Sequence, residues 1–398
     1  MWLWLDDLTA VESHQNCRLG RAPDALRRRP APVPWPFKRD SGRADTAGVE
    51  TTSNRSAGPS RPAAAPSSAW DEILRYARRY PSPHNSQPIK LRVEGARAEL
   101  FYDLDLGLPA ESYGIPFGSV CAGVFIETVS IAAHALGYRV AEALDYTTMD
   151  FGRGDRLHAL GMLTLEPAGK IDDLHPRLLL ERRTSRLPYA RRPVPTAALD
   201  DARREAAERG HMVAGSSDRR LVDRIIRLNQ QTLFYDLENP DVRAEIQNWL
   251  RYSERHARTT ADGLSARCLA LPGPLMRLFM GNYWIWKLPV VGTVLRHVYL
   301  RSMRGVTQVG WIKGPFSDER DYTDAGRTLL RVWLVLTSHG LHLHPFGSVI
   351  TNPRAHRELV DIVGEQENAE MIWMLFRVGY SRRPPESHRR DPQDMRLP

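Results

Sequence analysis

The chain has 398 residues, 42% of them hydrophobic, which is enough for two domains or for one core of two similar halves. Its formal net charge is +8, but the arginines are scattered among acidic residues, which argues against a nucleic-acid-binding protein. Cys17, Cys121 and Cys268 lie far apart without a C-x-x-C pair, so the sequence excludes a disulfide framework and favours a cytoplasmic protein.

Residues 1–67 are predicted to be a disordered N-terminal tail. They contain a basic run, several Pro-Ala steps and little apolar sequence to offset the entropy of ordering. The first five residues are apolar, but Asp6, Asp7 and Glu12 follow without an apolar h-region. We therefore expect this segment neither to direct export nor to anchor the chain.

The first ordered elements are predicted to be an amphipathic helix and a β-hairpin, joined by a loop over residues 81–88. The helix carries Trp70, Ile73, Leu74 and Ala77 on one face, and the hairpin spans residues 89–93 and 99–102. Prolines, Ser and Asn make the loop rigid and extended, with its polar side chains pointing one way. Taken alone, this pattern favours a simple helix-to-strand turn.

Two long apolar runs indicate an internal repeat. One begins at Ala122-Gly123 and ends at Gly137, and the other begins at Ala325-Gly326 and ends at Gly340. Runs that are apolar nearly all round are typical of helices buried in a core, and the closing glycines fit helix C-caps. Strand-like stretches follow at residues 157–165 and 371–378. The pattern predicts one α+β unit used twice, over residues 68–170 and 171–390.

The second half contains a basic segment, residues 181–189, and an insertion at about 230–322. Arg182, Thr184 and Arg186 alternate, so an extended backbone would place them on one side, where they could clamp a phosphate. A basic surface loop explains them equally well. The arginines of residues 382–390 suggest a solvated tail. The insertion has helical stretches near 241–258 and an aromatic segment at 271–299, interpreted as core, as a lid over an apolar pocket, or as an interfacial membrane contact.

The loop and the arginine segment resemble motifs of the FMN-dependent nitroreductase superfamily. Residues 81–88 are similar to its P-S-x-x-N-x-Q-P signature, although Ile89 replaces the usual Trp; residues 182–186 are similar to its R-R-[ST]-x-R motif. In that superfamily, each flavin lies between two subunits that supply one motif each. One motif in each half therefore implies a nitroreductase-like α+β fold of two tandem halves, a fused pseudo-dimer like the Acg-type branch. Such a chain is expected to be a monomer with one complete site.

The resemblance also implies which residues would contact the cofactor. The ring and ribityl chain would be bound by Pro81, Ser82, Asn85 and Gln87, and the phosphate side by Arg182, Thr184, Arg186 and Arg389. The stretch Pro345, Phe346 and Gly347 would supply a backbone N–H to flavin N5. NAD(P)H would be the co-substrate and a small planar electrophile the acceptor. No side chain is assigned a catalytic role.

Other interpretations remain open. The chain could sequester FMN without turnover, or perform a different flavin chemistry in a biosynthetic pathway. His339, His342 and His344 have the spacing of metal ligands, but no carboxylate or Cys lies nearby in sequence, so no metal site is predicted. Asp103 and Asp105 are interpreted as loop residues, and Cys121 as a buried small side chain.

Overall fold

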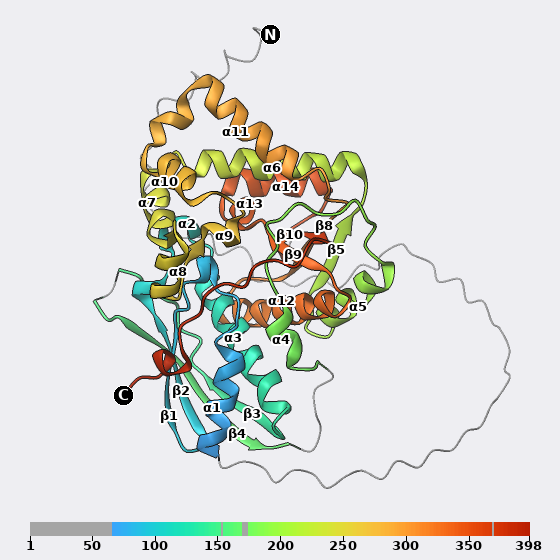
Figure 1. Ribbon diagram of the computed structural model, residues 1–398. Coiled ribbons are helices and arrows are strands. Elements are labelled where there is room, and N and C mark those ends of the chain that lie inside the picture. The colour runs from blue at the N-terminus through green and yellow to red at the C-terminus, as the bar shows by residue number, and fades with distance from the viewer. Residues whose placement is uncertain (1–65, 153, 169–173, 368–369) are drawn as a thin grey trace, which may run out of the picture. The chain divides into compact units, whose positions relative to one another are not determined.

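The computed structural model describes residues 66–398, apart from 153, 169–173 and 368–369 (Figure 1). The predicted tail of residues 1–67 therefore lies almost wholly outside the described residues. The described part begins with helix α1 (Pro66–Ala77), whose Trp70, Ile73, Leu74 and Ala77 are completely buried, as the apolar spacing predicts.

The first half is built on a four-stranded antiparallel sheet. The strands are β1 (Ile89–Glu94), β2 (Arg97–Asp103), β3 (Tyr138–Leu144) and β4 (Leu157–Pro167), in the order β1-β2-β4-β3. The predicted hairpin is present, with Ile89 opposite Tyr102. Three short helical turns and one long helix complete this half: η2 (Pro83–Asn85), η3 (Leu104–Leu106), α2 (Pro109–Ser112) and α3 (Phe117–His134).

The second half contains a sheet with the same internal order. Its strands are β5 (Met212–Ser216), β8 (Gln308–Pro315), β9 (His342–Pro345) and β10 (Glu370–Gly379), in the order β5-β8-β10-β9. In both sheets the first strand pairs with the second, the second with the fourth, and the fourth with the third, always antiparallel. The strands predicted at 157–165 and 371–378 are thus confirmed.

Two long helices, α3 and α12 (Glu319–Ser338), pack against each other at the centre of the described residues (Figure 1). Each follows the second strand of its sheet and precedes the third. A Cβ at Gly123 would overlap the backbone of Thr323, and a Cβ at Gly326 would overlap the backbone of Val120. The two glycines therefore let the helix backbones approach closely, and each one faces the residue three positions before the other. Although α3 is long and apolar enough to cross a membrane, it is mostly buried, as a core helix is.

Further helices cover both faces of the second sheet. Helix α5 (Thr196–Ala207) packs with α12 on one face, and α6 (Arg219–Asp236), α13 (Gly347–Thr351) and α14 (Pro353–Val363) share a second hydrophobic core on the other. Helix α4 (Arg177–Glu181) lies against α12. Burial on both faces explains why β8 and β10 are continuously buried and do not alternate.

The insertion between α6 and β8 is shorter than the sequence suggests. Its predicted range of 230–322 wrongly includes β8, a central strand whose two glycines and continuous burial conceal the usual alternation. The region 241–258 is also divided. The elements of the insertion are α7 (Pro240–Trp249), β6 (Leu250–Arg251), α8 (Glu254–Thr260), β7 (Leu264–Ser265), α9 (Ala266–Leu269), α10 (Gly273–Gly281), η4 (Tyr283–Lys287) and α11 (Pro289–Ser302).

The C-terminal segment, residues 380–398, returns to the first half. It ends in η5 (Pro392–Met395), and the Leu397 N–H donates to the Leu91 carbonyl at 2.7 Å. Arg389 donates to the Tyr80 carbonyl at 2.8 Å, and Arg390 to the Ser86 carbonyl at 3.1 Å. The interpretation of this region as a solvated tail is therefore wrong for Arg389 and Arg390, which bind carbonyl groups more than 300 residues earlier, whereas Arg382 and Arg383 are exposed.

Candidate functional site

The loop of residues 81–88 is tightly wound and not extended as predicted. His84, Asn85 and Gln87 have φ values of 47°, 60° and 55°, in the left-handed region that costs non-glycine residues about 1–2 kcal/mol each. Hydrogen bonds compensate for this strain: the Gln87 N–H donates to Ser82 Oγ at 3.0 Å. Asn85 and Gln87 are buried, whereas Pro81 and Ser82 are half-buried at the start of the loop.

The polar side chains of this loop contact the insertion and the C-terminal segment. The Asn85 side-chain amide donates to the carbonyls of Gly263 at 3.1 Å and His388 at 3.0 Å. The Gln87 amide donates to the Ala261 carbonyl at 3.0 Å, and its oxygen accepts the Arg390 N–H. Asn85 Oδ1 is buried and has no hydrogen-bond partner among the described residues. The loop is thus the point where three distant parts of the chain meet.

A cluster of four arginines, Arg79, Arg182, Arg183 and Arg389, lies next to this loop. Arg182 is 6% exposed, donates to the Arg79 carbonyl at 3.1 Å and has its guanidinium 4.5 Å from the Trp333 ring centroid. Burial, with Arg389, Arg79 and Arg183 nearby, holds the pKa of Arg182 well below its usual range. Burial and then Arg79 lower the pKa of Arg389 to about 10.

This arginine cluster has one carboxylate close by. Glu386 pairs with Arg79 at 2.6 Å and with Arg183 at 2.9 Å. Nε and Nη1 of Arg183 and Nε of Arg389 are buried without a hydrogen-bond partner in the described part of the chain. Two of the four guanidinium groups pair with Glu386, so the cluster has an excess of positive charge. Unpaired buried N–H donors are costly unless an anion accepts from them. The cluster therefore has the chemistry of an anion-binding site.

Arg186 belongs to a second, neighbouring basic group. Burial, and then Arg377 among its neighbours, lowers the pKa of Arg186. Burial, Arg377 and Arg186 hold the pKa of His344 well below its usual range, so His344 is neutral at pH 7. Arg377 is fully buried in β10 and donates to the Ser185 carbonyl at 3.0 Å. Cys268 in the insertion interacts electrostatically with both Arg186 and Arg389. The insertion therefore lies near both basic groups.

Thr184 and the stretch Pro345–Gly347 adjoin this second group. Thr184 forms a β-bridge with Leu343, one strand residue before His344. The Phe346 N–H donates to the Leu375 carbonyl at 2.7 Å, and its side chain, 2% exposed, belongs to the second core. The Phe346 N–H is therefore already used within the fold, and the place of Phe346 in the cofactor site stays a prediction. Gly347, the first residue of α13, carries the next N–H along the chain.

The other residues that the sequence offered as possible site residues have structural roles. His339 binds Asp201 at 2.8 Å, whereas His344 is buried beside Arg377; within residues 66–398 as described, no three His, Cys, Asp or Glu side chains form a group that could hold a metal. Asp103 is completely buried and makes two hydrogen bonds to Arg156. Cys121 is buried as predicted, and burial raises the pKa of its thiol, so it is not a reactive thiolate.

Sequence reasoning missed Arg79, Glu386, Arg377 and the backbone of 261–263. Arg79 stands two residues before the loop, and Arg377 is a cation within an otherwise apolar strand; both features could have drawn attention to them. Nothing in the sequence near Ala261 and Gly263 indicates a contact with residues 85–87, because that contact spans more than 170 residues.

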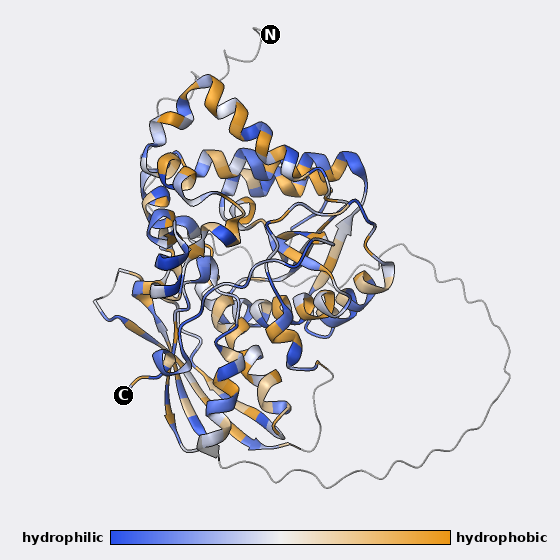
Figure 2. Cartoon of the chain, viewed as in Figure 1, coloured by the Kyte–Doolittle hydropathy of each residue, from blue (hydrophilic) through white to orange (hydrophobic). Residues whose placement is uncertain are grey.

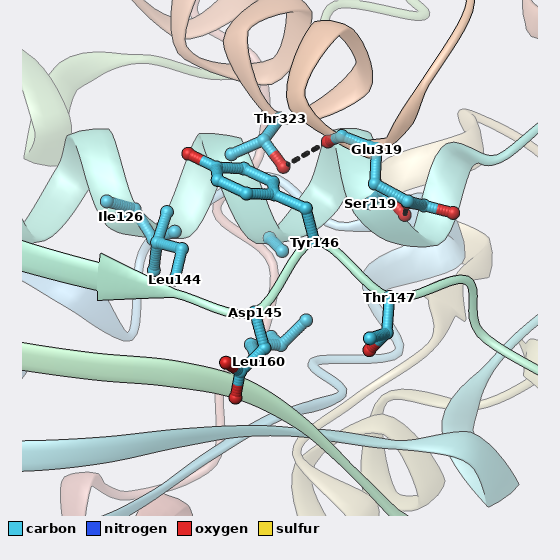
Figure 3. Close-up of a pocket in the computed structure, with 10 residues that line it drawn as sticks. Ser119, Ile126, Leu144, Asp145, Tyr146, Thr147, Leu160, Glu319 and Thr323 are labelled. Carbon is cyan, nitrogen blue, oxygen red and sulfur yellow. Dashed lines mark hydrogen bonds between the residues drawn. The ribbon is translucent and has the colours of Figure 1, made fainter.

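A small pocket lies elsewhere, at the crossing of α3 and α12. Ser119, Glu319 and Thr323 line it on one side, with Asp145 and Tyr146 opposite, as Figure 3 shows. The Ser119 hydroxyl donates to the Glu319 carboxylate. None of the predicted site residues lines this pocket, so it gives no support to their assignment.

Comparison with protein-family models and with curated proteins found no match. Comparison with solved structures found FMN-dependent proteins of the nitroreductase family. An FMN-dependent nitroreductase from Mycobacterium smegmatis, in complex with NADPH, is 16% identical, with a TM-score of 0.35, covering 53% of this chain and 92% of its own. An oxidised iodotyrosine deiodinase bound to FMN and 3-iodo-L-tyrosine is 14% identical, with a TM-score of 0.33 and coverages of 54% and 93%.

A nitroreductase with bound FMN from Bacteroides fragilis is 10% identical, with a TM-score of 0.32, covering 55% of this chain and 94% of its own. Each of these three structures thus matches along nearly its whole length, over about half of this chain. Because TM-scores this low establish neither fold nor function, the function proposed below rests on the residues of the chain itself.

Proposed function

We propose that the chain binds one FMN non-covalently and acts as an FMN-dependent oxidoreductase. The observation that carries this proposal is the buried arginine cluster beside the 81–88 loop, in which two of the four guanidinium groups pair with Glu386 and the other two do not. The unpaired N–H donors of Arg183 and Arg389 fit the oxygens of a phosphate monoester, and the unpaired Asn85 Oδ1 fits a donor on a polar ring. Bound there, FMN would supply hydride transfer from NAD(P)H to a small planar electrophile such as a nitroaromatic compound or a quinone.

Different residues of the chain would bind and orient different parts of the cofactor. Arg182, Arg183 and Arg389 would hold the phosphate by charge-assisted hydrogen bonds. Arg186 and Arg377 add fixed positive charge near the loop that follows β9, which favours an electron-rich ring there. His344 contributes no charge at pH 7, because its pKa is far below its usual range, so it can only donate or accept a hydrogen bond.

We further propose that the two halves form an intrachain pseudo-dimer with one complete site, and that the protein is a monomer. The identical strand order of the two sheets and the reciprocal packing of Gly123 and Gly326 support this proposal. The complementary placement of the two motifs supports it as well, since the loop lies in the first half and the alternating arginines lie in the second.

The second candidate is an FMN-binding protein without turnover. The backbone of the insertion closes on the loop, where Ala261 and Gly263 accept the side-chain amides of Gln87 and Asn85. A cofactor beneath that contact would be shielded from a second substrate, which favours storage. Access of NAD(P)H to the bound flavin therefore separates the two candidates.

The experiment is an absorbance spectrum of the purified protein, before and after NADH or NADPH is added without oxygen. Flavin bands that bleach support the oxidoreductase, and flavin bands that persist support storage. A colourless protein that does not bind added FMN would contradict both candidates. An acceptor series of nitroaromatics and quinones, with oxygen as the comparison, then defines the substrate class.

A further inference from the structure

The insertion exposes an unusual amount of apolar surface. Eight of the thirteen exposed large hydrophobic residues that the structure describes lie between residues 271 and 298: Leu271, Leu275, Leu278, Trp284, Leu288, Val290, Val294 and Val298. Val290 is 75% exposed and Trp284 is 63% exposed. Single exposed apolar residues need no explanation, but a contiguous group of this size marks a contact surface.

These residues form faces on two helices. Leu271, Leu275 and Leu278, at and just before α10, are spaced by four and three positions, and Val290, Val294 and Val298 on α11 by four and four. Each set therefore lies along one side of its helix. Figure 2 shows hydrophobic bands alternating with hydrophilic ones along α11, where it projects from α6. We call these two faces, with Trp284 and Leu288 between them, the α10–α11 face.

The aromatic residues of the same segment explain why the side chains of the α10–α11 face remain exposed to solvent. Trp286 packs against Phe234, Phe279 and Tyr283, with ring centroids 5.4, 5.8 and 6.3 Å away, and its indole N–H donates to the Phe279 carbonyl. The segment thus has its own small core with α6 and α7. The exposed side chains are the ones that this core does not use.

The charged side chains of the segment that carries the α10–α11 face have one sign, although Glu238 lies near Tyr283 at its base. The sequence contains no Asp or Glu from Gly263 to Ser317, but it has seven basic residues: Arg267, Arg277, Lys287, Arg296, Arg301, Arg304 and Lys313. Arg277, Lys287, Arg296 and Arg301 are exposed, and none of these four forms an ion pair with any residue that the structure describes. Lys287 and Arg296 lie over the rings of Tyr283 and Phe234, and no such contact is made by Arg277 or Arg301 among the described residues. Apolar side chains flanked by cations without carboxylate partners fit a surface that is itself apolar beneath a layer of negative charge.

We propose that the α10–α11 face docks on a bilayer surface with anionic phospholipid headgroups. Leucine and valine side chains would enter the boundary between headgroups and acyl chains, Trp284 would lie at headgroup depth, and the cations would pair with lipid phosphates. Helix α11 has 14 residues, which is too short to span a bilayer, so the contact is interfacial. A second copy of the chain fits less well, because a symmetric dimer through this face would bring basic surfaces together without carboxylates between them.

The test uses the full chain and vesicle sedimentation. Vesicles of pure phosphatidylcholine are compared with vesicles of equal parts phosphatidylcholine and phosphatidylglycerol. We expect binding to the anionic vesicles that weakens as salt is added. The combined Val290→Ser, Val294→Ser and Val298→Ser variant should lose at least about tenfold in binding, because three apolar side chains no longer leave water on docking. Combined Arg277→Gln and Arg301→Gln should lose a similar amount, because two cations no longer attract the anionic headgroups.

Matched control variants exclude general effects of polarity or charge. Leu180→Ser removes an exposed apolar side chain elsewhere, and combined Arg75→Gln and Arg203→Gln removes exposed cations elsewhere. Both should bind vesicles like the parent chain. Because all the substituted residues are exposed, circular dichroism and the melting temperature should not change.

Three results would overturn the proposal. The first is equal sedimentation of the parent chain and the triple Val→Ser variant with anionic vesicles. The second is a parent chain that does not bind vesicles but forms a dimer, detected by light scattering, which the triple Val→Ser substitution abolishes. The third is vesicle binding that appears only after proteolysis has removed residues 1–58. In that case residues 1–58, and not a membrane, would be the partner of the α10–α11 face in the intact chain.

Discussion

Asn85 and Gly263 exchange two hydrogen bonds across 178 residues of sequence. The Asn85 side-chain amide donates to the Gly263 carbonyl at 3.1 Å, and the Gly263 N–H donates to the Asn85 carbonyl at 3.2 Å. Gly263 has a φ of +71°, and a Cβ there would crowd the Trp249 carbonyl at 2.5 Å. This exchange joins the candidate cofactor loop to the insertion, so the two should loosen together.

Replacing Asn85 tests this connection. Asn85→Gly removes the amide but tolerates the left-handed backbone, so it should lower the free energy of unfolding by about 1–3 kcal/mol through the unpaired carbonyls of Gly263 and His388. Urea unfolding measures this change. Asn282→Ala, which removes a surface amide bonded within its own helix end, is the control and should cost less than about 1 kcal/mol. Equal losses in the two variants would contradict the role given to Asn85.

The arginine cluster predicts opposite effects on stability and on cofactor affinity. Arg182→Met leaves an apolar side chain against Trp333 and removes a buried cation beside Arg79, Arg183 and Arg389, together with its hydrogen bond to the Arg79 carbonyl. Without cofactor, the variant should be as stable as the parent or more stable by about 1 kcal/mol. Its FMN affinity should fall about 30-fold or more, because a charge-assisted contact is lost.

Thermal unfolding of the stripped proteins and fluorescence titration with FMN measure the two effects. Arg75→Met, at an exposed ion pair with Glu72, is the control and should leave FMN affinity unchanged. The double variant Arg182→Ala, Arg186→Ala should release FMN completely. If it retained flavin, the phosphate would bind somewhere else.

The crossing of α3 and α12 predicts a strong position dependence for glycine substitutions. Gly326→Ala places a methyl group against the backbone of Val120 and should cost about 3 kcal/mol or more, because backbone atoms cannot move aside as side chains do. Gly281→Ala, in α10 with open space around it, should be neutral or stabilising by up to about 1 kcal/mol. Melting temperatures of the two variants provide the comparison, and similar values would be evidence against close backbone packing.

Asp236 predicts a pH dependence of stability. Burial raises its pKa to about 6, above the value of 3.8 for a free aspartate, and it accepts a hydrogen bond from Asn352 at 2.7 Å. The folded state therefore holds this proton more tightly than the unfolded state. Its contribution to stability is present below pH 4 and is lost as the pH rises through 6.

Asp236→Asn keeps an acceptor for Asn352 but cannot ionise. It should raise the free energy of unfolding by about 1–3 kcal/mol at pH 7.5, estimated from a shift of roughly two pKa units, and by little at pH 4. Urea unfolding at the two pH values measures the difference between the variant and the parent chain. If this difference in the free energy of unfolding is the same at both pH values, Asp236 binds its proton equally in the folded and the unfolded state, and the prediction is wrong.

Local sequence patterns determined the elements that their own side chains specify. The two core helices were predictable because their apolar residues run nearly all round and a glycine follows each; Gly137 and Gly340 have φ values of 83° and 70°, as left-handed C-caps require. The first helix, the hairpin and the two strands ending near 165 and 378 follow from periodicity in the same way. Strand β8 was missed because burial on both faces removes the alternation that identifies a strand.

Tertiary structure alone decided which charges meet and which apolar faces remain exposed. Arg79, Arg182 and Arg389 converge from three distant parts of the chain, and nothing in a local pattern encodes contacts over such separations. The motif residues were recognisable, but the excess of arginine over carboxylate around them was not. Likewise, the sequence of the aromatic insertion favours core over a lid or a membrane contact, yet much of it is exposed, since exposure depends on which neighbours the folded chain supplies to each helix face.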